Sequence, residues 1–162
     1  MIDALDEEIL KILQANSRTP NAEIARKVGL APSAVFERIK KLEEKGIIEA
    51  YTLKLNARNL GQGLLCFIFV RSNEPAGGVQ TAQMLSSIPE VLEVHHVAGE
   101  DCFLAKVRAA DTDALGRLLR ERLAAIDTIT STRTTIVLET VKETGDLPLS
   151  RAAEEDSDAA SA

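Results

Sequence analysis

Aromatic residues are scarce in this sequence, at 3% of 162 residues, and tryptophan is absent. So few rings argue against a stacking platform for single-stranded nucleic acid. The longest nearly apolar run, residues 64–70 (LLCFIFV), is far shorter than the roughly 20 residues that span a bilayer, so we expect no transmembrane helix. Because acidic residues follow Met1 without a basic stretch, we expect no signal peptide and a cytoplasmic location.

Patterns for catalysis and metal binding are also lacking. The two cysteines, Cys66 and Cys102, are too few for a disulfide framework and wrongly spaced for zinc, so we expect reduced thiols. His95 and His96 are adjacent in a strand-like stretch and point to opposite faces, so packing or hydrogen bonding suits them better than joint chelation of a metal. With no nucleophile–base pair and no phosphate-cradling glycine loop, the sequence predicts no catalytic residue, cofactor or metal site.

The net charge of −6 is concentrated towards the C-terminal end. Residues 1–50 hold eight Lys/Arg against nine Asp/Glu, residues 51–141 hold nine against ten, and residues 142–162 hold two against six. The final stretch RAAEEDSDAASA lacks any large apolar side chain, so residues 144–162 are predicted to form an acidic, disordered tail. The rest of the chain is nearly neutral, and the acidity belongs mostly to this tail.

The first 50 residues are predicted to form three short helices. The first follows a capping Asp3 and ends near Ala15, and the second follows a capping Thr19, with Pro20 in its first position, and ends at Gly29. The third runs over residues 32–45 and places its apolar residues on one stripe, namely Val35, Ile39 and Leu42, with Phe36 beside them.

The turn between the second and third helices consists of residues 29–31 alone. A glycine-containing turn of this length is typical of a helix-turn-helix, although a small structural three-helix bundle has the same spacing. Apolar residues alternate over 47–55, which predicts a short strand or wing after the third helix.

The remainder of the chain predicts a ferredoxin-like α+β domain. Strands are expected at residues 64–71, 91–97, 102–108 and 130–141, with helices at 79–88 and from Asp111 or Thr112 to 126. The order βαββαβ gives an antiparallel sheet with two helices on one face. The expected divisions are a winged helix-turn-helix at 1–50, a linker strand and hinge at 51–62, the ferredoxin-like domain at 63–143 and the tail.

The strand at 64–70 is apolar at consecutive positions, which is typical of a strand buried on both faces. Two helices on one face of the sheet leave the other face open. We therefore expect a partner subunit to cover that face, so that the protein is at least a dimer.

Motifs in the two halves of the chain support one another. The first half carries LQANSR (13–18), EIA (23–25), VGL (28–30) and ERI (37–39), and the second carries VAGEDCFL (97–104) and TRTTIVL (132–138). Over roughly residues 3–143 they resemble the Lrp/AsnC (leucine-responsive and asparagine-regulator) family of prokaryotic transcription factors. The resemblance implies binding of double-stranded DNA, sensing of a small molecule such as an amino acid, and homodimers that assemble into tetramers or octamers. Two recognition helices on a dimer would meet half-sites about one helical turn apart. Binding through both helices would then compensate for the weak electrostatic attraction between DNA and a nearly neutral domain.

The candidate site residues fall into two groups. The DNA-binding candidates on the third helix lie off its apolar stripe and are able to face a major groove: Ser33, Ala34, Glu37, Lys40 and Lys41. Arg18 is a candidate phosphate contact, and Arg38 suits either packing or DNA. The candidate effector-binding residues, which the resemblance implies, are Gly99, Glu100, Asp101, Cys102, Thr132 and Thr134.

The sequence departs from the family pattern at two places. Ala31 stands where the family usually has Ser before the recognition helix, and its methyl group cannot cap that helix, which costs about 1 kcal/mol. The family's Gly-x-x-Asp-Tyr turn reads here as residues 99–103 (GEDCF), so the acid comes one position early and a thiol takes its place. An acid at this turn could pair with the α-amino group of an effector.

Two other functions remain open at this point. One is an architectural DNA-binding protein without an effector, which would give no heat in calorimetry against the twenty amino acids. The other is an enzyme such as a siroheme decarboxylase, which shares the fold and would give a visible absorption band with siroheme.

Overall fold

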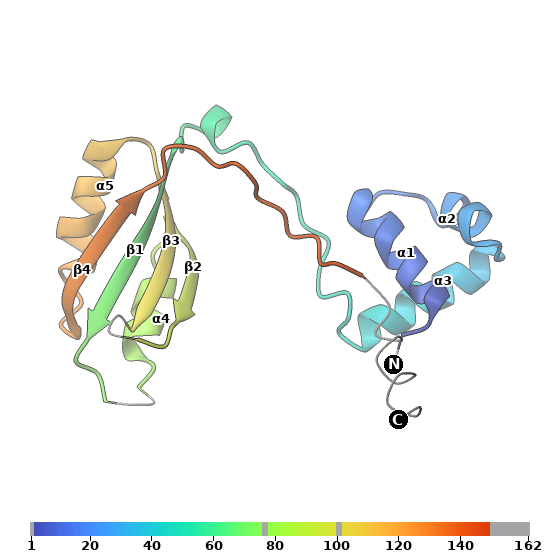
Figure 1. Cartoon of the computed structure of the whole chain (residues 1–162), viewed down its shortest axis with the longest axis horizontal. Coiled ribbons are helices and arrows are strands. Elements are labelled where there is room, and N and C mark those ends of the chain that lie inside the picture. The colour runs from blue at the N-terminus through green and yellow to red at the C-terminus, as the bar shows by residue number, and fades with distance from the viewer. Residues whose placement is uncertain (1, 76–77, 100–101, 150–162) are drawn as a thin grey trace, which may run out of the picture. The chain divides into compact units, whose positions relative to one another are not determined.

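The computed structural model describes residues 2–75, 78–99 and 102–149 (Figure 1). The chain divides into two compact units. One contains the residues up to Leu53 together with those from Glu143 onward, and the other contains Lys54–Lys142. No helix among the described residues is both long enough and apolar enough to cross a membrane.

The first unit is built from three helices: α1 (Ala4–Ala15), α2 (Asn21–Val28) and α3 (Pro32–Glu44). Asp3 caps α1 by accepting a hydrogen bond from the Asp6 N–H at 2.8 Å, while the Asp6 carboxylate accepts one from the Asp3 N–H at 3.1 Å. Gly29 ends α2 in the left-handed conformation (φ +70°), as expected. The apolar stripes of the three helices meet in one core, which includes Ile9, Leu13, Ile24, Val35 and Ile39.

Two local predictions for this unit are wrong. Thr19 does not cap α2, because Pro20 occupies the N-cap position and Thr19 lies one residue too early; its hydroxyl donates instead to the Asn16 carbonyl at 2.8 Å. Residues 47–55, for which a short strand or wing was predicted, form no strand, since the described part of the chain offers them no neighbouring strand to pair with.

The C-terminal segment lies against α1. Leu147 donates its backbone N–H to Gln14 Oε1 at 2.8 Å, and Gln14 Nε2 donates to the Leu147 carbonyl at 3.2 Å. Residues 144–149 of the predicted tail form neither helix nor strand, whereas residues 150–162 lie outside the described residues.

The N-terminus of α3 offers a test of the missing cap. Ala31 has an extended backbone (φ −74°, ψ 146°), which is the N-cap geometry, and no side-chain hydrogen bond. We expect Ala31→Ser to raise the free energy of unfolding of the helical unit by about 1 kcal/mol, measured by urea denaturation with circular dichroism. Ala22→Ser, at an exposed position inside α2, is the control and should not stabilise. Equal stability of Ala31→Ser and the natural chain would contradict the capping argument.

The second unit is an antiparallel sheet with the strand order β2-β3-β1-β4. Its elements are a short 3₁₀ turn (Arg58–Leu60), β1 (Leu64–Ser72), α4 (Gln80–Ser86), β2 (Val91–His96), β3 (Phe103–Ala109), α5 (Thr112–Leu118) with a π-helical turn (Leu119–Leu123), and β4 (Ile129–Ile136). Asp111 caps α5 by accepting from the Ala114 N–H at 2.8 Å. The predicted βαββαβ order and fold class are confirmed.

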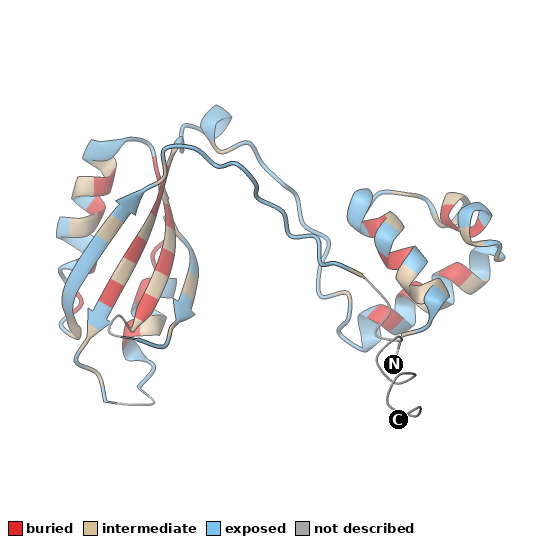
Figure 2. Cartoon of the chain, in the orientation of Figure 1, coloured by how far each residue is buried: buried red, intermediate tan, exposed pale blue. Residues whose placement is uncertain are grey.

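One face of the sheet carries the core. Alternate residues of β1 and β3 pack against α4 and α5 in a single cluster that includes Ile68, Val70, Ala105, Leu85 and Leu115. The alternation is visible along both central strands in Figure 2. On the other face Phe67, Phe69 and Leu104 remain half-buried, and the Arg133 guanidinium lies 4.0 Å from the centre of the Phe69 ring.

β4 is shorter than the sequence predicts. The β-branched run continues to residue 141, but the strand ends at Ile136, which pairs with Cys66 near the start of β1. Beyond Val137, whose N–H donates to the Leu65 carbonyl at 2.9 Å, β1 has almost no residues left to pair with. Strand length here depends on the partner strand rather than on β-propensity.

Candidate DNA-binding and effector sites

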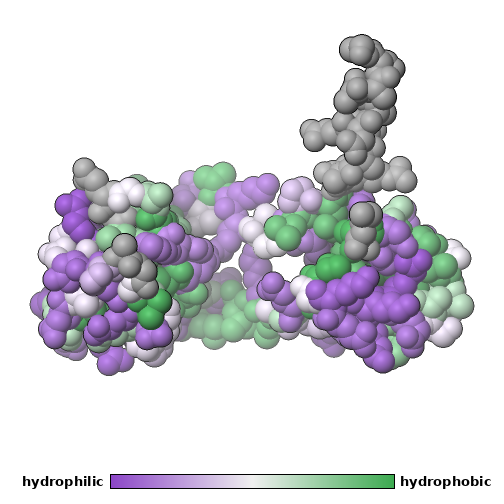
Figure 3. Space-filling view, turned by 90° about the horizontal axis from the view of Figure 1, so that it is seen from below, coloured by the Kyte–Doolittle hydropathy of each residue, from purple (hydrophilic) through white to green (hydrophobic). Residues whose placement is uncertain are grey.

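α3 separates a buried stripe from an exposed face. Val35, Ile39 and Leu42 are buried, whereas the exposed residues include most of the predicted DNA contacts, namely Ser33, Glu37, Lys40 and Lys41. Ala34 is half-buried at the border of the two faces. Hydrophilic residues predominate on the face of the helical unit drawn in Figure 3. Among the described residues of this unit, the exposed face of α3 therefore takes no part in the hydrophobic core.

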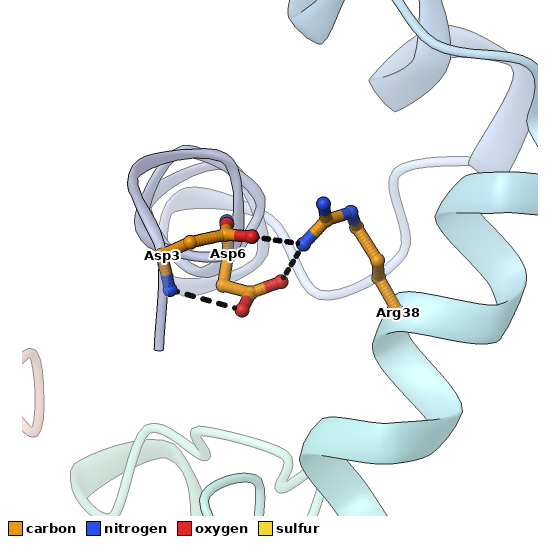
Figure 4. Close-up of polar contacts among 3 residues, drawn as sticks. All are labelled: Asp3, Asp6 and Arg38. Carbon is orange, nitrogen blue, oxygen red and sulfur yellow. Dashed lines mark hydrogen bonds and ion pairs between the residues drawn. The ribbon is translucent and has the colours of Figure 1, made fainter. Parts of the chain in front are cut away.

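The Arg38 side chain contacts the N-terminus of α1 (Figure 4). Its Nη1 lies 2.7 Å from both Asp3 Oδ2 and Asp6 Oδ1, which ties α3 to the first turn of α1. The bond from the Asp6 N–H and the Arg38 guanidinium lower the pKa of Asp3, and the two carboxylates raise the pKa of Arg38. Of the two roles that the sequence left open for Arg38, the structure therefore shows the interhelical one.

Two other predicted contacts are exposed cations. Arg18 lies in the turn between α1 and α2, where its backbone N–H donates to Asn16 Oδ1 at 3.0 Å. Lys40 Nζ lies 3.8 Å from Glu44 Oε1, a loose pair on the helix surface that DNA phosphates could replace.

Phe36 is a candidate that the sequence reasoning did not select. Its side chain is 54% exposed on α3, between the polar residues Ser33 and Lys40 along the same face. An exposed aromatic ring on such a face is able to contact a thymine methyl group. The sequence feature that could have indicated Phe36 is its position one residue after Val35, off the apolar stripe.

The segment after α3 is anchored through Tyr51. The Tyr51 hydroxyl donates to Glu43 Oε1 at 2.9 Å. Burial, followed by the hydrogen bond and the negative charge of Glu43, raises the pKa of Tyr51 to about 12. Because this pKa exceeds the ordinary value of 10, the interaction stabilises the fold fully below pH 10 and is lost as the pH rises from 10 through 12.

This pKa can be measured directly, since Tyr51 is the single tyrosine of a chain without tryptophan. We expect ultraviolet titration at the tyrosinate band to give a midpoint near 12, and Glu43→Gln to move it towards 10. Glu44→Gln removes the neighbouring carboxylate and should leave the midpoint in place. A midpoint of 10 in the natural chain would show that the segment is not anchored here.

Of the effector candidates that the structure describes, Cys102 and Thr132 both lie beside Val70, near the end of β1. The Cys102 N–H donates to the Val70 carbonyl at 2.9 Å, and Val70 pairs with Thr132 on β4. The Val97 N–H donates to the Cys102 carbonyl at 2.9 Å and closes the turn, in which Gly99 has a positive φ of 136°. Thr134 lies farther along β4, opposite Ile68, whereas Glu100 and Asp101 lie outside the described residues.

The thiol at this turn meets a polar group that the sequence reasoning missed. The half-buried Cys102 Sγ lies 3.7 Å from the Ser72 carbonyl oxygen. The Ser72 hydroxyl is 3.0 Å from the hydroxyl of the buried Thr81, which is 2.7 Å from that of Thr128. These hydroxyls are separated by long stretches of sequence, so no local motif could have predicted the chain of hydrogen bonds.

The histidines have separate partners. His95 Nε2 lies 3.1 Å from Glu93 Oε2, whereas the His96 ring packs at a tilt against Phe103, with the ring centroids 5.1 Å apart. Glu93 also accepts a hydrogen bond from Lys106 at 3.1 Å, and both partners lower the pKa of Glu93.

Among the residues that the structure describes, no group of three or more His, Cys, Asp or Glu side chains could hold a metal ion. Cys66 and Cys102 are both free, and burial raises the pKa of the Cys66 thiol.

Comparison with known proteins supports both halves of this arrangement. Residues 2–49 match the winged helix-turn-helix DNA-binding family, and residues 65–147 match the Lrp/AsnC ligand binding domain. The leucine-responsive regulatory protein of Escherichia coli strain K12 is 36% identical over 148 residues, covering 90% of this chain and 90% of that protein. The chain belongs to the Lrp/AsnC family.

Two other transcriptional regulators are similar to this chain in sequence or in fold. An uncharacterized HTH-type transcriptional regulator from Pyrococcus abyssi is 37% identical over 145 residues, which cover 88% of this chain and 97% of that protein. A transcriptional regulator from Neisseria meningitidis, solved in complex with L-methionine, superposes with a TM-score of 0.87 at 30% identity and covers 91% of this chain and 97% of that one. This chain is thus a helix-turn-helix transcriptional regulator with a ligand-binding domain, rather than an enzyme.

Proposed function

We propose that this Lrp/AsnC regulator binds operator DNA in the cytoplasm as a dimer or a higher assembly, through the exposed face of α3. The observation that carries the proposal is the separation of the two faces of α3: the buried stripe holds the unit together, and among the described residues of this unit the polar face takes no part in the hydrophobic core. Arg18 supplies a phosphate contact outside α3. In this arrangement Glu37 and Phe36 meet base edges, while Lys40 and Lys41 neutralise phosphates.

We infer that the effector is an amino acid or a related metabolite, bound at the turn of residues 99–102 together with Thr132 and Thr134. The L-methionine complex of the Neisseria meningitidis regulator supports this class of ligand. In this chain the side chain after the acidic pair is the Cys102 thiol rather than a carboxylate. Effector binding then changes the assembly or its affinity for DNA.

The proposal can be tested at Cys102, where this chain has a thiol in place of the acid of the family's turn. We expect calorimetry to show binding of at least one of the twenty amino acids, with a change in affinity for the protein's own promoter DNA in the same conditions. Cys102→Asp places a carboxylate at the family position and should tighten the binding of that amino acid by roughly 3- to 10-fold. Cys102→Ser, which adds no charge, is the control.

Two results would count against the effector site. If no amino acid produces heat or changes DNA affinity in either the natural chain or Cys102→Asp, the architectural function without an effector is favoured. If Cys102→Asp and Cys102→Ser bind the amino acid equally, the effector does not place its ammonium group at this turn.

A further inference from the structure

A cavity lies on the helical side of the sheet unit, away from every residue assigned above. It has a volume of about 220 Å³ and lies between the end of α4 and the chain that follows α5. Its floor is apolar, because Ile88 and Ile126 are only 6% and 3% exposed. Met84 and Ala125 complete the apolar walls. A space of about 150 Å³ is enough to admit benzene in a protein interior, so this one admits a molecule of somewhat larger size.

The same cavity is lined by two side chains of opposite charge. Glu121 and Arg122 both border it and both are exposed. Within the described ranges 2–75, 78–99 and 102–149, neither forms an ion pair with another residue or with its neighbour. A carboxylate and a guanidinium beside an apolar floor complement a ligand that carries an ammonium group, a carboxylate and an aliphatic side chain.

The backbone at these two residues is unusual. α5 does not continue as an α-helix but widens into the π-helical turn Leu119–Leu123, and the Ala124 N–H donates to the Leu119 carbonyl at 3.0 Å. Such turns are rare and occur frequently at functional sites. Glu121 and Arg122 are the members of this turn that border the cavity. Across the cavity, the Ser87 hydroxyl donates to the Met84 carbonyl at 2.7 Å, and its oxygen is still able to accept a hydrogen bond.

We propose that this cavity is a second small-molecule site, which takes an aliphatic α-amino acid in its zwitterionic form. Arg122 binds the α-carboxylate, Glu121 and the Ser87 hydroxyl bind the α-ammonium, and the side chain lies on Ile88 and Ile126. The site shares no residue with the turn at 99–102, and it does not depend on an effector binding there.

Met84 makes the proposal directly measurable. The chain has two methionines, Met1 and Met84, so the full-length protein labelled at methionine methyl groups gives two resonances, one of them from the cavity wall. We expect L-leucine to shift the Met84 resonance saturably and to leave that of Met1 in place. Leucine analogues that lack one charge, 4-methylpentanoate and 3-methylbutylamine, should bind roughly 3- to 10-fold more weakly or not at all.

Charge variants locate the binding. Arg122→Gln and Glu121→Gln should each weaken the Met84 titration by roughly 3- to 10-fold, and Ala125→Phe should abolish it by filling the cavity. Arg117→Gln, on an exposed part of α5 outside the cavity lining, is the matched control and should bind as the natural chain does. Thr132→Val, at the proposed effector turn, should also leave the Met84 titration unchanged.

The proposal is overturned if L-leucine does not shift Met84, or if both analogues shift it with the affinity of leucine. It is also overturned if Thr132→Val removes the shift while Arg122→Gln retains it, because the signal would then report binding at the turn. Failure of the effector proposal appears differently, as loss of the effect of Cys102→Asp with the Met84 titration intact.

Discussion

Replacing Lys40 and Lys41 together by alanine is expected to weaken binding to the promoter DNA of this regulator by roughly 10- to 100-fold and to flatten its salt dependence. Both lysines are exposed on the polar face of α3, and of the two only Lys40 has an ion-pair partner among the described residues, the loose 3.8 Å pair with Glu44. Each lysine that contacts a phosphate adds about 0.9 to the slope of log K against log salt. For four such lysines in a dimer, the slope should fall by up to about 3.6.

The control for this experiment removes the same charge elsewhere. Lys11→Ala combined with Lys142→Ala takes away two lysines that lie outside α3. Its slope and affinity should remain close to those of the natural chain. Equal losses in the two double variants would mean that the effect reflects net charge, and unchanged binding of the α3 variant would remove these lysines from the interface.

Local chemistry made the helical unit largely predictable. The start of α1 and the C-terminal end of α2 follow from groups within a few residues of each other, namely the Asp3–Asp6 capping box and the left-handed Gly29. The apolar stripe of α3 likewise follows from spacing alone. These features need no knowledge of the rest of the chain, which is why sequence reasoning reached them.

Features that depend on distant partners were not predictable. Arg38 could be assigned to packing only once α1 was seen to bring Asp3 and Asp6 within 2.7 Å of it. The end of β4 at Ile136 depends on where β1 begins, although its own residues favour a longer strand. The cavity beside Glu121 and Arg122 arises from a π-helical turn and the end of α4, which no single sequence window contains.

The open face of the sheet leads to the second large prediction, dimerisation. Phe67 and Phe69 on β1 and Leu104 on β3 lie on the face opposite the helices and remain half-buried in the isolated chain. Around them lie charged side chains, such as Lys106 paired with Glu93 at 3.1 Å and Arg133 above Phe69. An apolar centre with a charged rim is typical of a protein–protein interface, and a second copy of the chain presents the same surface.

Phe67→Lys is expected to break such a dimer. Phe67 lies between Lys106 on β3 and Thr135 on β4, so a lysine there adds a like charge beside Lys106 at the centre of the proposed interface. We expect the dimer dissociation constant to rise by roughly 100-fold or more. Light scattering at micromolar concentration should give twice 17.5 kDa or a higher multiple for the natural full-length chain and 17.5 kDa for the variant.

The Phe67→Lys variant should also distinguish the effect of dimerisation from effects on folding and on the DNA-contacting residues. Its affinity for a palindromic operator should fall with the loss of avidity, while the circular dichroism spectrum stays that of the natural chain. Val79→Lys is the matched control, because Val79 is a 59% exposed apolar residue at the start of α4, on the helical side of the sheet. A natural chain that scatters as a 17.5 kDa monomer at micromolar concentration would contradict the dimer, and the open face would then need another partner.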